Sequence, residues 1–316
     1  MISIVVPIYN EEGNIEKLLM EVKSVLPLLG IEYEMILVDD GSTDRTLEIL
    51  KAAARKDPAV KVVRFKRNFG QSAAMSAGIE RASGEYIVTL DADLQNDPRD
   101  IPKLLERIKA GGCDIVSGWR KDRKDSFLTR VLVSRAANAM ISWITGVKLH
   151  DYGCTLKIYK AEVLKNVMLY GELHRFLPAL ASWQGAKIEE LVVQHRKRQT
   201  GKSKYGLTRI YRVLFDLISV KYFLSYNAKP LHFFGIIGFF TMLPGLVVAS
   251  SVTAYRLLFH ANIAPRIPSL IFSALSILMG WQMMVLGLLA DLMIRSSKES
   301  AKGLSRDYLI QETIGL

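Results

Sequence analysis

Two long uncharged stretches constrain the fold of this 316-residue chain more than any other feature. No Asp, Glu, Lys or Arg occurs from Leu231 to Tyr255, or from Ile267 to Ala290. Each stretch exceeds the roughly 20 apolar residues that an α-helix needs to cross a bilayer. The sequence therefore predicts two transmembrane helices, and a pair of buried core helices is the less favoured interpretation.

The link between the two stretches, from Arg256 to Arg266, is short, so the two helices should form a hairpin with both outer ends on one side of the membrane. The segments outside the hairpin carry more Lys and Arg than the link does, and this bias favours the cytoplasmic side. We therefore expect a two-span protein of the inner or plasma membrane. Its catalytic domain and both termini should face the cytoplasm.

The net charge of +11 is concentrated just before the first uncharged stretch. Nine Lys or Arg residues and one acid, Asp216, lie between His195 and Leu231. A basic segment beside a membrane span can bind anionic lipid headgroups or other phosphates. Nucleic-acid binding fits poorly because the adjacent spans hold this segment at the membrane. We expect the membrane, and no nucleic acid, as a partner.

Apolar runs alternate with helical patterns through the first 120 residues. Strands are expected at Ile2–Pro7, Glu34–Val38, Val60–Phe65, Glu85–Leu90 and Asp114–Ser117. Helices are expected between them, at Asn14–Leu26, Thr43–Lys56, Gln71–Ala82 and Pro98–Ala110. Such alternation predicts a mostly parallel sheet with helices on both faces.

Polar residues follow every one of these five expected strands. In chain order, they are Tyr9, Asn10 and Glu11; Asp39, Asp40, Gly41 and Ser42; Arg67, Asn68 and Gly70; Asp91, Asp93 and Gln95; and Gly118 and Arg120. Parallel strands end at the same edge of a sheet, which is where such folds bind ligands. The chain contains no GxxxxGK[ST] or GxGxxG motif, which argues against a P-loop NTPase or a dinucleotide oxidoreductase.

Asp91 and Asp93 directly follow the apolar run Tyr86–Leu90. Two closely spaced carboxylates at a strand end offer hard oxygen ligands, which can share a divalent cation with the phosphates of a ligand. Asp is also common in turns, where it accepts hydrogen bonds from local backbone amides. Both interpretations stay open from these residues alone.

The ordered motifs of the chain resemble a known family. The segments Ile4–Glu11, Val38–Thr46 and Asp91–Asp93 resemble the GT-A glycosyltransferases of family 2. Four further motifs resemble, more narrowly, the polyprenyl-phosphate glycosyltransferases, a group that includes dolichol-phosphate mannose synthase and the bactoprenol-phosphate glucosyltransferases. They are RNFG at 67–70, SRxxN at 134–138, DYGC at 151–154 and HRKRQTGKSKY at 195–205. The resemblance covers essentially the whole chain.

The resemblance implies an α/β fold with a GT-A catalytic domain, which is Rossmann-like and built on a mostly parallel sheet. This cytosolic domain would span residues 1–205, followed by juxtamembrane amphipathic helices at 206–230. Two transmembrane helices would occupy 231–294, and 295–316 would form a cytoplasmic tail. The tail could pack on another subunit of a homo-oligomer.

Site roles are carried over from the family by position. The residues around the nucleotide sugar donor would be Pro7, Tyr9, Glu11, Asp39, Asp40, Arg67, Asn68 and Arg120. Asp91, Asp93 and Gln95 would hold the cofactor, Mg²⁺ or Mn²⁺, against the donor diphosphate. Asp151 joins Asp91 and Asp93 in the catalytic set, either as a residue that positions substrate, as a base, or in a structural role.

The acceptor implied by the resemblance is a polyprenyl phosphate, whose headgroup carries about 1.5 to 2 negative charges by analogy with phosphorylated side chains. Arginine, lysine and hydroxyl groups bind such an anion. Our candidates are Ser134, Arg135, Arg196, Arg198, Lys202, Ser203 and Lys204. Because a phosphate oxyanion is already a nucleophile, no dedicated general base is required.

The expected reaction is the inverting, metal-dependent transfer of a single hexose to undecaprenyl or another polyprenyl phosphate at the cytoplasmic membrane face. UDP-glucose is the expected donor, with UDP-linked amino sugars or GDP-mannose as alternatives. A processive polysaccharide synthase is a second possibility, but it should show a QxxRW motif and more spans, and Trp183 lies instead in SWQG. A noncatalytic, nucleotide-regulated membrane anchor is a third, and it should lack an intact metal site.

Overall fold

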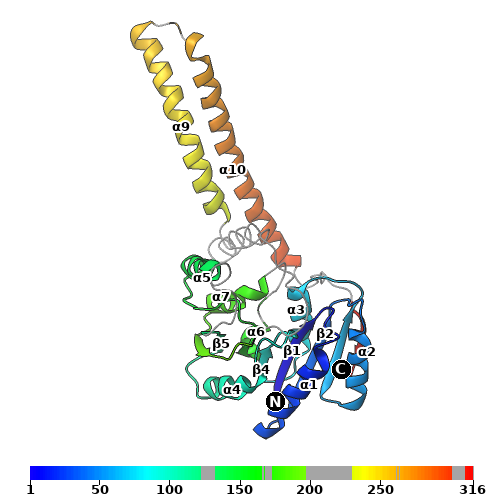
Figure 1. The fold of residues 1–316 in the computed structure, drawn as a ribbon. Coiled ribbons are helices and arrows are strands. Elements are labelled where there is room, and N and C mark those ends of the chain that lie inside the picture. Colours follow the sequence, from blue (N-terminus) through cyan, green and yellow to red (C-terminus); the bar gives the residue numbers. More distant parts are fainter. Residues whose placement is uncertain are drawn as a thin grey trace. The chain divides into compact units, whose positions relative to one another are not determined.

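The computed structural model describes residues 1–121, 132–165, 167, 173–196, 230–260, 262, 264–300 and 310–315. The chain forms two compact units, shown in Figure 1. One unit consists of Met1–Val220 together with Arg306–Leu316, and the other is Lys221–Ser305. We call them the catalytic unit, after the role that the sequence predicts for it, and the hairpin unit.

In the described part of the catalytic unit, eight strands form one sheet in the order β7-β5-β6-β4-β1-β2-β3-β8. Their bounds are β1 Ile2–Ile8, β2 Tyr33–Asp39, β3 Val60–Phe65, β4 Tyr86–Thr89, β5 Ile115–Trp119, β6 Lys157–Lys160, β7 Ile188–Val192 and β8 Ile310–Ile314. Strands β6 and β8 run antiparallel to their neighbours, and the other pairings are parallel.

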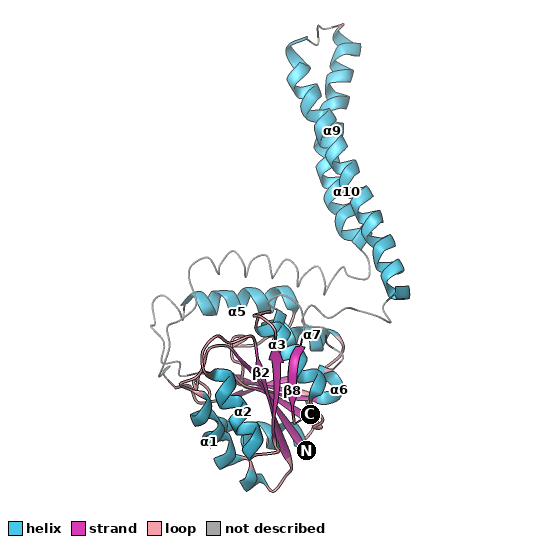
Figure 2. Cartoon of the chain, turned by 90° about the vertical axis from the view of Figure 1, so that its right-hand side faces the viewer, coloured by secondary structure: helices cyan, strands magenta, loops and turns pink. Residues whose placement is uncertain are grey.

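Helices cover both faces of this sheet, because its central strands are apolar on both sides. Ile4 and Val6 of β1 pack in one core with residues of α1 (Ile15–Val25), α2 (Thr46–Lys56) and α4 (Ile101–Lys109). Val5, between them, packs in the other core with residues of α3 (Gln71–Arg81), α6 (Ala161–Leu164) and α7 (Leu177–Trp183). Figure 2 shows α1 and α2 on one side of the strands and α6 and α7 on the other.

The remaining elements of the catalytic unit are short connections and one longer helix. They are η1 (Pro27–Leu29), η2 (Pro98–Asp100), α5 (Leu132–Thr145) and η4 (Leu173–Phe176). The expected mostly parallel sheet with two helical layers is confirmed, and the five expected strands correspond to β1–β5. Strands β6, β7 and β8 were not predicted, because they are only four or five residues long and mix charged with apolar side chains.

The sequence predicted a cytoplasmic tail at the end of the chain, but part of this segment forms a strand of the sheet. Ile310–Ile314 pairs antiparallel with β3, the edge strand that would otherwise expose its backbone groups. Lys51 of α2 also contacts Glu312 at 2.5 Å. Such a pairing between distant parts of the sequence has no local signature. It returns the chain to the catalytic unit, so both outer ends of the hairpin lead into the same unit.

The hairpin unit contains α9 (Pro230–Phe259), η5 (Ala264–Arg266) and α10 (Ile267–Ser300). The two helical stretches Pro230–Phe259 and Ala264–Ile294 are each long and apolar enough to cross a membrane. Only 11% of the most apolar window of each is buried, so most of these Leu, Ile and Phe side chains face outward. An apolar exterior is what a bilayer requires, and it would be unfavourable in water.

Small residues at intervals of seven line the seam between α9 and α10. Gly238 and Gly245 of α9 face Gly280 and Ser273 of α10. A Cβ atom added at Gly238 would lie 2.5 Å from the Gly280 carbonyl oxygen, and one added at Gly245 would lie 2.7 Å from that of Ser273. Ser273 Oγ donates to the Gly245 carbonyl oxygen at 2.6 Å. Close backbone approach of this kind stabilises helix pairs in membranes, where the hydrophobic effect between helices is absent.

Gly238→Leu should therefore separate the two helices, and Gly235→Leu should not. Gly235 lies less than one turn away on α9, and a Cβ there would meet nothing within 4 Å. We expect the first variant to lower the thermal unfolding midpoint of the detergent-purified protein, while the control keeps it or raises it slightly through better helix propensity. Equal midpoints for the two variants would contradict this packing.

Candidate active site

The loop after β1 is tied to the loop after β2. Asn10 adopts a left-handed backbone conformation, with φ 53°, that Asn tolerates better than most residues. Its backbone N–H donates to Ser42 Oγ at 3.0 Å, and its own side-chain oxygen accepts from the Thr43 N–H at 2.8 Å. The Glu11 N–H donates to Thr46 Oγ1 at 2.9 Å. These bonds hold the loop of the predicted donor residues Tyr9 and Glu11 at the sheet edge.

Asp39, the last residue of β2, is completely buried opposite Ile8 of β1. Its Oδ1 atom accepts from the Ser42 N–H at 3.0 Å, which is the turn that Asp commonly forms. Its Oδ2 atom has no hydrogen-bond partner among the described residues. A buried carboxylate oxygen without a donor is costly. The arrangement suits a ligand that brings an N–H or O–H group.

Asp40, a predicted donor residue, has a structural role, because both of its oxygens accept hydrogen bonds from the backbone. Oδ1 accepts from the Phe69 N–H at 2.7 Å, and Oδ2 accepts from the Gly70 N–H at 2.9 Å. Asp40 thus holds the loop after β3 with both of its carboxylate oxygens. Burial raises the pKa of Asp40 to about 6, although these two N–H groups act in the opposite direction.

The loop after β3 lies directly against the loop after β2. Gly41 has a φ of 69°, and a Cβ atom there would lie 2.5 Å from the carbonyl carbon of Arg67. Only glycine permits this approach. The predicted donor residues Arg67 and Asn68 are exposed, and the Arg67 guanidinium lies 4.3 Å from the centre of the Phe69 ring.

Asp91 and Asp93 lie just beyond β4, on the same edge. Gln71, the first residue of α3, donates from Nε2 to Asp91 Oδ1 at 2.8 Å, and the Gln95 N–H donates to Asp93 Oδ1 at 3.1 Å. Leu94, between the two aspartates, has a φ of 60°, which is strained for this residue type. Burial, and then the charge of Asp93, raise the pKa of Asp91. The two carboxylates therefore form a centre of negative potential.

The residues present fit a divalent cation of the Mg²⁺ type. Among the described residues, no group of three or more His, Cys, Asp or Glu side chains converges on one point. Mg²⁺ sites that bind nucleotides commonly use one or two carboxylates and take their remaining ligands from phosphates and water. The pair Asp91 and Asp93 matches that pattern. The third predicted ligand, Gln95, lies in the same loop, and its backbone oxygen accepts from the Arg196 N–H at 2.8 Å.

Arg120 and Asp151 form a buried bidentate ion pair. Arg120 Nε donates to Asp151 Oδ2 at 2.7 Å and Nη2 donates to Oδ1 at 3.0 Å, and Oδ1 also accepts from the Gly153 N–H at 3.1 Å. Burial acts to lower the pKa of Arg120, but Asp151 outweighs it and the pKa is raised. The Asp151 carboxylate thus holds Arg120 at the end of β5. This arrangement favours positioning over the alternative of a general base.

Lys157 supports the same region, and the motifs did not single it out. Its side chain, in β6, is buried and donates from Nζ to the backbone oxygens of Tyr152 and Cys154 in the DYGC motif. Burial lowers the pKa of this amine. The only sequence signal for it was a lysine at the start of the short segment KIYK, which forms β6. Gln71 was also missed, because it lies one residue beyond the end of the RNFG motif and is not part of it.

Arg196 must be removed from the predicted phosphate-binding set. Its guanidinium contacts Glu21 of α1 at 2.7 Å and Asp97 at 2.5 Å, so two carboxylates of the protein already neutralise it. Ser134 and Arg135 lie in α5, where only the backbone is described. The other predicted phosphate ligands, Arg198, Lys202, Ser203 and Lys204, lie outside the described residues, as do the expected juxtamembrane helices.

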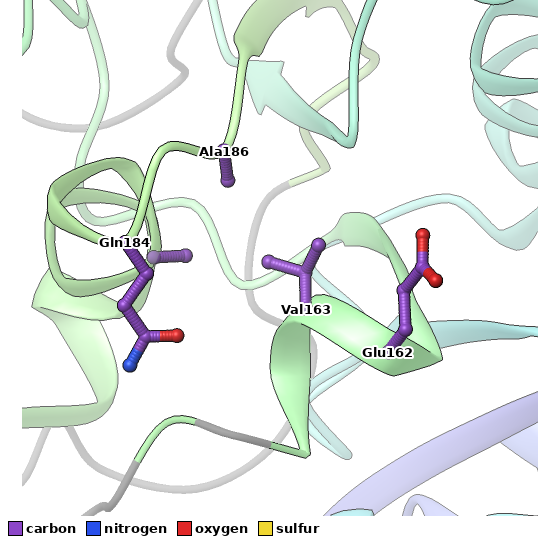
Figure 3. A pocket seen from close by; sticks show the side chains of 5 residues that line it. Glu162, Val163, Gln184 and Ala186 are labelled. Carbon is purple, nitrogen blue, oxygen red and sulfur yellow. The ribbon is translucent and has the colours of Figure 1, made fainter.

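A shallow pocket between α6 and α7 is unrelated to this site. Figure 3 shows it lined by Glu162, Val163, Gln184 and Ala186, together with Ala181. Helix α6 follows Lys160, which pairs with Tyr86 at the start of β4. The pocket therefore lies at the edge of the sheet opposite Asp91.

Comparison with known proteins identifies the class of this fold and site. Residues 3–168 match Glycosyl transferase family 2. The chain is 43% identical over 298 residues to dodecaprenyl-phosphate galacturonate synthase of Rhizobium johnstonii, covering 93% of this chain and 88% of the relative. It is 38% identical over 292 residues to undecaprenyl-phosphate 4-deoxy-4-formamido-L-arabinose transferase of Pseudomonas paraeruginosa, covering 92% and 84%.

The chain therefore belongs to glycosyl transferase family 2 and is a glycosyltransferase, as its motifs predicted. These two relatives are named as polyprenyl-phosphate glycosyltransferases. Among solved structures, glucosyl-3-phosphoglycerate synthase from Mycobacterium tuberculosis, in complex with Mn²⁺, UDP and glucosyl-3-phosphoglycerate, matches with a TM-score of 0.55 and 18% identity. The match covers 71% of this chain and 79% of that one, and it confirms the GT-A fold. The relatives are enzymes, which argues against the alternative of a noncatalytic, nucleotide-regulated membrane anchor.

The raised pKa of Asp40 gives a prediction about the metal-free protein. Because the folded-state pKa of about 6 exceeds the ordinary value of 3.8, the folded protein binds more protons between these values, and stability falls as pH rises through them. Asp40→Asn cannot ionise, so its thermal midpoint should rise relative to wild type between pH 4.5 and 7 by this argument.

Asp44→Asn is the matched control. The pKa of Asp44 is lowered, because hydrogen bonds from Thr46 and Glu12 outweigh the effect of its burial. Asp44 is thus already ionised at pH 4.5, and the offset of its variant from wild type should stay constant over the same range. A constant offset for Asp40→Asn as well would contradict the prediction.

Proposed function

We propose that this protein transfers a single sugar residue from a uridine diphosphate sugar to the phosphate of a polyprenyl lipid, with inversion at the anomeric carbon. The observation that carries the proposal is the Asp91 and Asp93 pair at the end of β4, in a chain that also contains an apolar helical hairpin. The two polyprenyl-phosphate relatives support the acceptor class.

The buried Asp39 oxygen supports the choice of nucleobase. A carboxylate only accepts hydrogen bonds, so it selects a base with a ring N–H group. Uracil offers N3–H and guanine offers N1–H, whereas the corresponding ring nitrogens of cytosine and adenine are acceptors. We favour uridine because the solved relative binds UDP. Pro7, Tyr9 and Glu11 would surround the base and ribose from the loop after β1.

Asp91 and Asp93, with Gln95 as the third proposed ligand, would hold Mg²⁺ or Mn²⁺ against the donor diphosphate. When bound, the cation acts as a Lewis acid that offsets charge on the departing nucleoside diphosphate. The protein's own contribution is orientation. Gln71 fixes Asp91, and Asp151 holds Arg120 near enough to Asp91 that the arginine acts to lower the pKa of this carboxyl, against the larger effect of burial.

The acceptor phosphate needs positioning and no proton removal, since its oxygen is already charged. The role of Asp151 supports this mechanism, because both oxygens of its carboxylate already accept hydrogen bonds from Arg120 and the residue is not needed as a base. Ser134, Arg135, Arg198, Lys202, Ser203 and Lys204 remain the proposed phosphate ligands. The hairpin would keep the enzyme in the inner membrane, with the catalytic unit and both termini in the cytoplasm.

The sugar is chosen from the relatives and from the motifs. UDP-glucose is the donor that the motifs favour, and UDP-galacturonate joins it because of the galacturonate synthase. The test incubates the purified protein with Mg²⁺, undecaprenyl phosphate and one radiolabelled donor at a time: UDP-glucose, UDP-galacturonate, UDP-N-acetylglucosamine or GDP-mannose. We expect label from one UDP-sugar to enter the organic phase. Label from GDP-mannose alone, or label in a water-soluble polymer, would refute the proposal.

Asp93→Asn should reduce transfer at least about 100-fold, because it removes one of two charged metal ligands at the site of leaving-group stabilisation. Mn²⁺ affinity, measured by electron paramagnetic resonance, should fall in parallel. Asp57→Asn is the control, since Asp57 pairs with Lys23 at 2.7 Å before β3, at the opposite edge of the sheet. Turnover by the wild type in excess EDTA, or by Asp93→Asn at the control rate, would contradict the metal site.

A further inference from the structure

A buried polar pair lies next to the site and has no part in the function described so far. Ser72, in the first turn of α3, is 2% exposed, and His174, in η4, is 5% exposed. Ser72 Oγ lies 2.8 Å from His174 Nδ1 and also accepts from the His174 backbone N–H at 3.3 Å. Two bonds between the same residues join η4 firmly to the start of α3.

The hydrogen bonds of His174 also fix the direction of the next residue. Arg175 Nε donates to His174 Nε2 at 3.4 Å. A ring nitrogen that accepts carries no proton, so the neutral imidazole carries its proton on Nδ1 and donates it to Ser72. The contact through Nε orients the Arg175 guanidinium, whose terminal nitrogens form the fork that binds phosphate or carboxylate oxygens.

The same turn of α3 holds the metal-site carboxylate. Gln71, adjacent to Ser72, donates to Asp91 Oδ1 at 2.8 Å. The next residue, Ser72, bonds His174, and the His174 ring in turn accepts from Arg175 Nε. These contacts connect both Arg175 and Asp91 to the first turn of α3, although 84 residues separate them in the sequence.

We propose that Arg175 is a further substrate-binding residue, which donates hydrogen bonds to the phosphate oxygens of a substrate beside Asp91 and is positioned by the buried Ser72–His174 pair. This inference rests on the proposed function, in which both substrates bring phosphate to this edge of the sheet. The phosphate comes from the donor diphosphate or from the lipid acceptor, and the chemistry of recognition is the same.

Arginine suits this place on electrostatic grounds. A nucleoside diphosphate sugar carries two negative charges on its diphosphate, and the acceptor phosphate adds nearly two more. The carboxylates of Asp91 and Asp93 add a further two. The divalent cation supplies only two positive charges. Additional positive charge is required to bring these anions together. An arginine stays protonated in such a site and can bind two oxygens at once.

The test uses the full-length protein in detergent with Mg²⁺ and compares wild type, Arg175→Gln, Arg175→Lys and Arg81→Gln. Arg81 is the matched control, because it lies at the far end of α3 and bonds the Ala77 carbonyl oxygen of its own helix. Calorimetry measures the affinities for UDP and for uridine, which lacks phosphate. Transfer assays measure KM for the donor and for the lipid acceptor.

If Arg175 binds the donor, Arg175→Gln weakens UDP about 10- to 100-fold, the loss expected for a charged hydrogen bond, and leaves uridine unchanged. If it binds the acceptor, UDP affinity is unchanged and the acceptor KM rises by a similar factor. In both cases Arg175→Lys recovers part of the loss, and Arg81→Gln matches wild type.

If Arg175→Gln weakens the binding of UDP and of uridine equally, the residue has a structural role and the inference is overturned. The inference is also overturned if both affinities and both KM values stay within twofold of wild type. If Arg175→Gln unfolds, Ser72→Ala must show the same selective loss in smaller measure, and its absence overturns the inference. A wild type that transfers no sugar refutes the proposed function. The calorimetry then decides the role of Arg175 alone: selective weakening of UDP supports the inference, and a UDP affinity equal to that of wild type overturns it. A wild type that does not bind UDP overturns both.

Discussion

The parallel pairing of β2, β1 and β4 is the constraint on which the rest of the site depends. Ile8 pairs with Asp39, and Val5 pairs with Thr89, so the loops that follow these strands leave the sheet at the same edge. Asp39 and Asp91, far apart in the sequence, can therefore face one ligand. Because both faces of these strands are buried, a shift of the register by one residue would move each side chain into the opposite core, where the packing does not fit it, and the arrangement is strongly specified.

The aspartates of the site divide into two groups according to the donors around them. Asp40 accepts two backbone N–H groups and Asp151 holds a guanidinium, so both carboxylates are committed within the protein. Asp39 keeps a buried oxygen without a donor among the described residues, and Asp91 lies beside a second carboxylate. The first group shapes the loops, and the second group creates a need for a hydrogen-bond donor and a cation.

Much of the fold could be predicted because its signals are local. The strand and helix periods of the first 120 residues, the two uncharged stretches and the ordered motifs led to the fold class and the family, and both are confirmed. Strand β8 could not be predicted, because its pairing with β3 joins residues about 250 positions apart. The seam of small residues between α9 and α10 likewise acquires its meaning only when the helices are paired.

The sequence by itself determined the class of enzyme, the two long apolar helices and the residue types at the ends of the strands, since periodicity, charge and motif spacing are properties of the chain alone. Only the tertiary structure decided which side chains are already occupied. Arg196, a predicted phosphate ligand, is neutralised by Glu21 and Asp97. Arg175, which no motif marked, bonds His174, and Ser72 connects that histidine to the turn of α3 that also holds Asp91. Hydrogen bonds and ion pairs are saturable, so the availability of a charged group depends on its neighbours in space.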